Sequence, residues 1–230
     1  MKTFADNIIA FNRSLEFNGR LPEGVRVMNP FKESKKALAA STAFYKKYYN
    51  DSQKRHIILG INPGRFGAGL TGIPFTDPKR LIEKCGLSYD GVPAHEPSSV
   101  FIYNMIDAYG GAENFYRKFY INSICPLGFT KETDSGKEVN YNFYDSKDLM
   151  AAAHDFMVES IKKQLAFGIY RDTCFCLGRG KNEKILLRLN ETHGFFKKIV
   201  ALEHPRFVMQ YKSKTMQQYI DKYIAAFQLS

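Results

Sequence analysis

Residues 57–77 read IILGINPGRFGAGLTGIPFTD, an apolar run followed by a glycine-rich segment. The run over residues 56–61 has the length and β-branched content of a buried strand, and it ends at Asn62-Pro63-Gly64. The segment after it combines small residues, two Phe and two Thr with almost no charge. This composition suits a backbone that wraps closely around a flat ligand, and a purely structural turn is the alternative.

The glycine-rich segment lacks the patterns of known phosphate-binding loops. A P-loop ends in Gly-Lys-Ser/Thr, and no such triplet follows here. Gly67-x-Gly69-x-x-Gly72 does not lie at a turn that opens a helix, as the dinucleotide fingerprint requires. A nucleotide-binding α/β protein remains an alternative, with Arg65 as the cation that the loop offers to a phosphate.

The chain on both sides of this segment predicts alternating strands and helices. Three further apolar runs read as strands, at residues 119–124, 172–177 and 196–202. Helical periodicity and capping residues predict helices at 4–17, 34–48, 77–85, 98–109, 112–118, 148–168, 182–192 and 215–227. Residues 21–31 are expected to be irregular, 130–147 to form a long surface excursion, and 206–214 to be a basic linker.

Alternation of strands and helices implies right-handed crossovers and a mostly parallel sheet. In such a sheet the carboxyl ends of the strands meet at one edge, where ligands bind. Asn62, Asn122, Gly178 and His204 follow or end the four predicted strands. We therefore expect these residues to converge on one crevice beside the glycine-rich segment.

Composition narrows the class of protein. A chain of 230 residues with 44% hydrophobic content can bury one core, so a single domain over residues 1–230 is expected. The net charge of +10 favours a polyanion such as nucleic acid, or else serves only solubility. No apolar run of membrane-spanning length and no secretory signal occur, so we expect a cytoplasmic or nuclear protein with no membrane. Cys85, Cys125, Cys174 and Cys176 match no metal-site spacing and read as buried thiols.

The expected crevice holds amides and an imidazole, without a carboxylate pair or a metal cluster. Hydrolysis of ordinary glycosides usually needs two carboxylates. When the leaving group departs as a stabilised anion, no strong acid is required. A hydrogen-bond donor near the departing base and a group that orients water are then sufficient.

Four motifs then resemble one family, the single-strand-selective monofunctional uracil-DNA glycosylases. They are Asn62-Pro63-Gly64-x-Phe66-Gly67 with Thr71-Gly72-x-Pro74-Phe75, Asn122-x-x-Cys125-Pro126-Leu127, Gly178-Arg179 and His204-Pro205. They follow the family's order on matching strands. The resemblance implies a three-layer α/β/α fold with a four-stranded parallel sheet. It also implies a monomeric, cofactor-free and metal-free base-excision repair enzyme that flips uracil, or another deaminated base, out of DNA and leaves an abasic site.

The resemblance also assigns roles by position. Asn62 orients the attacking water, and His204 donates to O2 of the departing base. Phe75 stacks on the flipped ring, and Asn122 reads its Watson–Crick edge. The remaining base-binding positions are those of the loop, Gly64, Phe66 and Ala68.

Three departures from the family pattern concern base range and DNA contacts. Arg65 replaces a proline, Ala68 replaces a methionine and Arg206-Phe207 replaces Ser-Pro. A smaller residue at 68 enlarges the pocket, so 5-substituted uracil or xanthine is a further expected substrate. Candidate DNA contacts are Arg65, Arg179, Arg206, Phe207, Lys212 and Lys214, with Arg206 and Phe207 expected to fill the gap left by the flipped base. The alternative function is a nucleic-acid-binding module on the same fold without catalysis.

Overall fold

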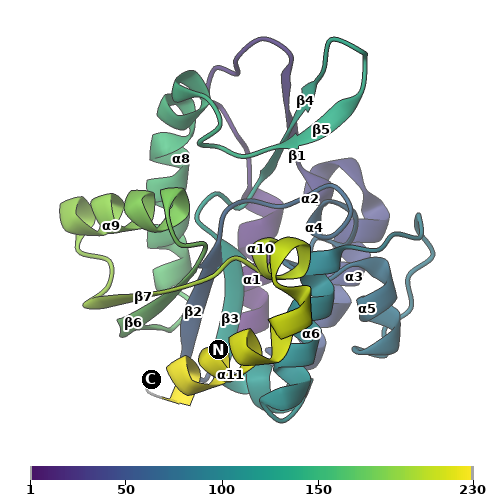
Figure 1. Cartoon of the computed structure of the whole chain (residues 1–230), viewed down its shortest axis with the longest axis vertical. Helices are drawn as coiled ribbons and strands as arrows, with labels where there is room; N and C mark the ends of the chain where they lie inside the picture. The colour runs from purple at the N-terminus through teal and green to yellow at the C-terminus, as the bar shows by residue number, and fades with distance from the viewer. Residues whose placement is uncertain (1, 229–230) are drawn as a thin grey trace.

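A computed structural model describes residues 2–228 of the chain (Figure 1). The elements up to the middle of the chain are α1 (Phe4–Ser14), β1 (Val25–Met28), α2 (Pro30–Glu33), α3 (Lys35–Tyr48), β2 (Arg55–Gly60), α4 (Ala68–Thr71), α5 (Pro78–Glu83), α6 (Pro97–Ala108) and α7 (Ala112–Lys118). Those that follow are β3 (Phe119–Ser123), β4 (Gly128–Glu132), β5 (Glu138–Tyr141), α8 (Lys147–Leu165), β6 (Ile169–Leu177), α9 (Lys181–His193), β7 (Lys198–Leu202), α10 (Pro205–Tyr211), η1 (Ser213–Thr215) and α11 (Met216–Gln228).

Four strands form a parallel sheet in the order β3-β2-β6-β7. The sequence order reverses direction at β2, because β3 pairs on one side of it and β6 on the other. A switch point of this kind opens a crevice beyond the carboxyl ends of the strands. Helices cover both faces of the sheet, so the predicted three-layer fold is confirmed (Figure 1).

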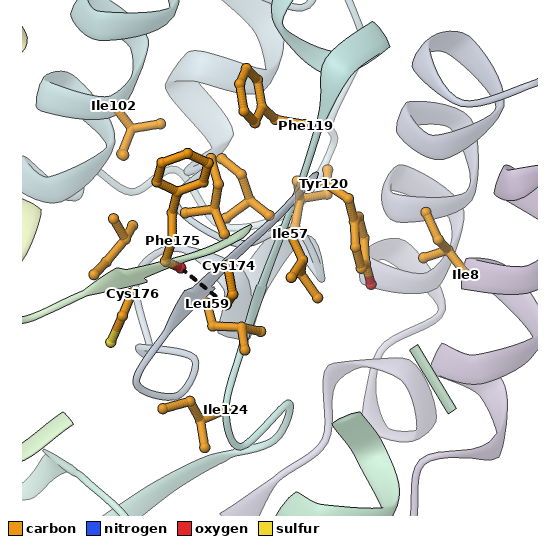
Figure 2. Close-up of a cluster of buried hydrophobic side chains, with 14 of the residues drawn as sticks. Ile8, Ile57, Leu59, Ile102, Phe119, Tyr120, Ile124, Cys174, Phe175 and Cys176 are labelled. Atoms are coloured by element: carbon orange, nitrogen blue, oxygen red, sulfur yellow. Dashed lines mark hydrogen bonds between the residues drawn. The ribbon is translucent and has the colours of Figure 1, made fainter. Parts of the chain in front are cut away.

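The hydrophobic core fills both faces of this sheet (Figure 2). On one face the ring of Tyr120 in β3 packs edge-on against Phe4 of α1, with centroids 5.5 Å apart. On the other face Phe119 packs against Phe227 of α11 at 4.7 Å. Neighbouring residues of β3 therefore point to opposite layers, as the alternation of a strand requires. The same alternation decides which polar residue at the end of β3 reaches the crevice.

A second, antiparallel sheet joins β1, β4 and β5 in the order β1-β4-β5. This corrects two expectations, since residues 21–31 contain β1, and residues 130–147 contain β5 and the end of β4. Val27 pairs with Phe129, and Phe129 pairs with Tyr141 on its other side. Phe129 and Phe143 are fully buried, which anchors this small sheet and the turn after it onto the core. Residues 128–143 are therefore packed against the core at both ends and do not form an irregular surface loop.

The segment after His204 is a helix, α10, and not the basic linker expected from its composition. His204 caps this helix, because its ring nitrogen Nδ1 accepts a hydrogen bond from the backbone N–H of Arg206 at 3.1 Å. Pro205 occupies the first helical position, where its missing N–H costs nothing. Within residues 2–228 no helix is both long and apolar enough to cross a membrane.

Candidate active site

A pocket of about 280 Å³ lies at the carboxyl edge of the parallel sheet. The glycine-rich loop, the start of α6, the segment after β5 and the helix α10 surround it. Its lining residues are Ile61, Asn62, Pro63, Gly64, Ala68, Pro74, Phe75, Glu96, Ser98, Ser123, Asn140, Asn142, Tyr144, His204, Arg206, Phe207, Gln210 and Tyr211. The structure thus gathers Asn62, Gly64, Ala68, Phe75 and His204 in one cavity, as the sequence predicted.

The side chain of Asn62 is held by the segment that follows the second sheet. Its Oδ1 accepts a hydrogen bond from the backbone N–H of Phe143 at 3.1 Å, and its Nδ2 donates to the carbonyl of Tyr141 at 3.3 Å. These two contacts fix which end of the amide is the acceptor. A carbonyl oxygen has two lone pairs, so Oδ1 can still accept from a water in the pocket.

The imidazole of His204 is neutral at physiological pH. Burial, together with the positive charge of Arg206, lowers the pKa of His204 to about 4. Because Nδ1 accepts from the Arg206 backbone N–H, the proton of the neutral ring belongs on Nε2. His204 therefore offers an N–H donor while carrying no charge.

Phe75 forms an aromatic wall of the pocket and adopts a strained backbone conformation. Its φ is +53°, a value that residues other than glycine rarely adopt. Buried hydrogen bonds on neighbouring residues fix this backbone conformation. Thr71 Oγ1 donates to the carbonyl of Thr76 at 2.6 Å, and the hydroxyls of Thr76 and Tyr103 are 2.9 Å apart. A β-carbon at Gly60 would lie 3.2 Å from the ring, so glycine there lets the ring rest on the end of β2.

Strand alternation carries Asn122 away from this pocket, which corrects the role expected for it. Asn122 points to the same face as Tyr120 and lines a separate recess of about 10 Å³. Its amide is already occupied, since Nδ2 donates to the hydroxyl of Tyr120 at 2.6 Å and Oδ1 accepts from the Ser123 backbone at 2.8 Å. Ser123, one residue later, is the polar side chain of β3 that reaches the pocket.

Ser123, Ser98 and Glu96 are polar pocket residues that the sequence did not reveal, and each has a free side-chain group. Ser123 and Ser98 are buried, at 4% exposure each, and neither hydroxyl has a hydrogen-bond partner among residues 2–228. Burial, and secondly the charge of Asp77, raises the pKa of Glu96 to about 7. In the sequence Glu96-Pro97-Ser98 reads only as the start of a helix, and Ser123 reads only as a strand residue, so no pattern revealed these groups.

Several predicted residues lie outside the pocket. Phe66 is half exposed beneath the guanidinium of Arg65, whose Nη1 is 3.3 Å from Glu138 of β5. Arg65 thus ties the glycine-rich loop to the second sheet and is not free for a phosphate in this arrangement. Arg179 is 3.5 Å from the carboxylate of Glu203 and stays largely exposed.

The helix α10 forms the outer rim of the pocket. Arg206 and Phe207 line it, together with Gln210 and Tyr211 one turn later. Phe207 is 41% exposed, and its ring lies 5.6 Å from that of Tyr211. Lys212 and Lys214 follow at the exposed end of the helix. An aromatic and cationic surface therefore borders the cavity, as the sequence predicted.

The four cysteines are buried free thiols, and burial raises the pKa of Cys125 and Cys176 to about 12. Such thiols are poor nucleophiles. Within residues 2–228 no cluster of three or more His, Cys, Asp or Glu side chains is placed to hold a metal ion.

Residues 46–228 match the family model described as the uracil DNA glycosylase superfamily. The chain belongs to the uracil-DNA glycosylase superfamily. A solved structure, described as the crystal structure of wild-type Pedobacter heparinus SMUG2, is 62% identical to it. The match covers 100% of this chain and 98% of that one, with a TM-score of 0.98. The resemblance read from four short motifs is therefore confirmed over the whole chain.

As a member of this superfamily the chain is a DNA glycosylase, a hydrolase that cleaves N-glycosidic bonds in base-excision repair. The pocket of this glycosylase combines an oriented amide, an uncharged N–H donor and an aromatic wall. These are the groups that release of a stabilised base anion requires.

Proposed function

We propose that the enzyme hydrolyses the bond between uracil and deoxyribose in DNA, in the pocket lined by Asn62, Phe75 and His204, and leaves an abasic site. The observation that carries this proposal is the neutral His204, whose Nε2–H shares a cavity with the fixed amide of Asn62. No described lysine lines the pocket, so a Schiff base with the sugar is not expected.

The roles follow from the chemistry of the groups. The flipped base stacks on Phe75, and a water hydrogen-bonded to Asn62 Oδ1 attacks C1′ of the deoxyribose. As the C1′–N1 bond breaks, the electron pair moves onto the base. The Nε2–H of His204 stabilises the negative charge that builds on the O2 of the base. A neutral donor suits this task, because it stabilises the developing anion through a hydrogen bond and no proton has to bind the ring first.

Recognition of the base edge falls to Ser123 in this proposal. A hydroxyl can donate to O4 or accept from N3–H by rotating, so Ser123 discriminates less strictly than a fixed amide. This freedom favours a broad base range, including xanthine, whose oxo, N–H, oxo edge matches that of uracil. The small side chain of Ala68, which lines the same pocket, provides room for a second ring or a 5-substituent.

The DNA lies across α10 in this proposal. Arg206 and Phe207 fill the space vacated by the flipped base, and Lys212 and Lys214 contact flanking phosphates. The enzyme acts as a monomer, since one chain supplies every group named here.

Release of free base from synthetic oligonucleotides tests the proposal. Wild type is expected to release uracil from a single-stranded oligonucleotide and leave a site that breaks only on heating in alkali. Ala68→Met is expected to slow release of xanthine more than that of uracil, because it fills the added space. A chain that binds these oligonucleotides without releasing any base would instead be the non-catalytic module.

A further inference from the structure

Glu96 lies at the entrance of α6 and belongs to the same pocket as Asn62 and His204. Its carboxyl packs on the glycine-rich loop, where Oε1 is 3.2 Å from the position that a β-carbon of Gly64 would take. A β-carbon at Gly67 would overlap the carboxyl itself. Glycine at position 67 therefore leaves space that this carboxyl fills, so the loop and Glu96 form one wall.

The backbone of Glu96 is anchored, whereas its carboxyl is unpaired. The Glu96 N–H donates to Oδ2 of the fully buried Asp77 at 2.7 Å, and Ser99 Oγ donates to the same oxygen at 2.7 Å. The Glu96 carboxyl makes no hydrogen bond or ion pair with any group in residues 2–228. A largely buried carboxyl without a partner is costly, and such groups occur mainly where a ligand supplies the partner.

Two charged groups act on this carboxyl, Asp77 at the start of α5 and Arg206 of α10. Arg80 and His95 pair with Asp77, at 3.3 and 3.7 Å from its carboxylate. The neutral ring of His204 lines the same pocket. Burial and the negative charge of Asp77 raise the pKa of Glu96, against the opposing effect of Arg206, to about 7. The carboxyl therefore changes charge near physiological pH.

The other lining residues cannot take a proton from water at neutral pH. Amides do not accept a proton, and His204 Nδ1 is already used by the Arg206 N–H. Burial, with the charge of Asp145, raises the pKa of Tyr144 to about 12, so this side chain carries its proton throughout. Among the residues that line the pocket, Glu96 is the sole carboxylate.

We propose that Glu96 is a further catalytic residue of the reaction, and that it accepts the proton of the water that Asn62 orients. This proposal rests on the proposed function. In the step, a bond forms between the water oxygen and C1′, and the C1′–N1 bond breaks with its electron pair going to the base. One O–H bond of the water breaks and its proton moves to a carboxylate oxygen of Glu96. After product release this proton passes to solvent.

Single-turnover release of uracil from a single-stranded oligonucleotide, measured from pH 5.5 to 9 with excess enzyme, tests this role. The wild-type rate should rise about tenfold per pH unit below pH 7 and level off above it. Glu96→Gln should remove this dependence and lower the rate above pH 8 by about 10²-fold, with a smaller difference below pH 6. Glu191→Gln, at an exposed position of α9, should behave as wild type.

His204 stays neutral from pH 5.5 to 9, because its pKa is about 4. Its titration therefore does not contribute to the pH dependence of the rate. Glu96→Asp should keep the pH-dependent limb at a reduced rate. A Glu96→Gln enzyme with the wild-type pH profile, or with an equal loss at every pH, would overturn the proposal. So would a loss confined to affinity for an oligonucleotide with an uncleavable uracil analogue. Failure of the proposed function would look different, since wild type itself would then release no uracil at pH 8.

Discussion

The two faces of the central sheet end in different kinds of site. On the face of α6 and α10, the sheet opens into a pocket of about 280 Å³, where Ser123, Ser98 and Glu96 have free polar groups. On the face of α1 and α3, it ends in a recess of about 10 Å³, where the amide of Asn122 is bonded on both sides. The two sites share Pro63, Ala68 and Pro74 as a common wall.

The hydrogen bonding of the polar groups differs between the two sites, and this difference predicts which substitutions affect activity and which affect stability. A polar group bonded within the protein rigidifies the fold, and its loss leaves its former partner unpaired at a cost of about 1–3 kcal/mol. A polar group without a partner in a cavity contributes little to folding stability and is available to bind a ligand. Substitutions on the open face should therefore change activity more than stability, and substitutions on the closed face should do the reverse.

The largest expected effect concerns the two groups that we propose contact the reacting atoms. Asn62→Ala and His204→Ala should each lower single-turnover uracil release by about two to four orders of magnitude, which corresponds to roughly 3–5 kcal/mol. Asn114→Ala and His154→Ala change exposed residues of the same types and serve as controls. Full activity in either pocket variant would remove that residue from the mechanism.

A smaller effect is expected on the rim, where Phe207 is exposed. Phe207→Ala should slow release of a base-paired uracil by about tenfold and leave a single-stranded substrate nearly unchanged, because only the duplex must have its stacking replaced. Tyr170→Ala provides a matched control, since Tyr170 is exposed to the same degree on β6. An equal loss on both substrates would show that Phe207 does not fill the gap.

The smallest effect is on stability and comes from the open face. The pKa of Glu96 is raised from its ordinary value to about 7, so its ionised form disfavours folding, and stability falls as the pH rises through this range. Glu96→Gln removes the charge and should raise Tm by a few degrees at pH 8. The rise should be much smaller at pH 4.5, where the carboxyl is neutral in the folded state and only half ionised in the unfolded state. Thermal melts at the two pH values measure this, and an equal shift at both would contradict it.

The parallel sheet and the shared pocket of Asn62 and His204 could be predicted because their signals are local. Continuous apolar runs predicted the four strands. Because the carboxyl ends of parallel strands lie at one edge of the sheet, Asn62 and His204 were expected to lie close together. The second sheet could not be predicted in this way. Its strands are short and half polar, and Phe129 and Tyr141 are buried or half-buried only because they pair across the sheet.

Two further misses have their own physical causes. Choosing Asn122 over Ser123 is a shift of one residue, which in a strand moves a side chain to the opposite face. The strand run alone does not reveal which face holds the pocket. Glu96 escaped because its place is set by contacts with Asp77 and Gly67, 19 and 29 positions away in the chain. Neither contact leaves a spacing pattern.

The claim that chemistry belongs to one face of the sheet is tested most directly by comparing Ser123→Ala with Asn122→Ala. Single-turnover uracil release and Tm are measured for both variants under the same conditions. Ser123→Ala should slow release by about tenfold to a hundredfold with little change in Tm, because only a hydrogen bond to the base is lost. Asn122→Ala should lower Tm by several degrees, at about 2–4 °C for each kcal/mol, and keep most of the activity of the folded fraction. The reverse result, an inactive but stable Asn122→Ala enzyme beside a fully active Ser123→Ala enzyme, would contradict the account.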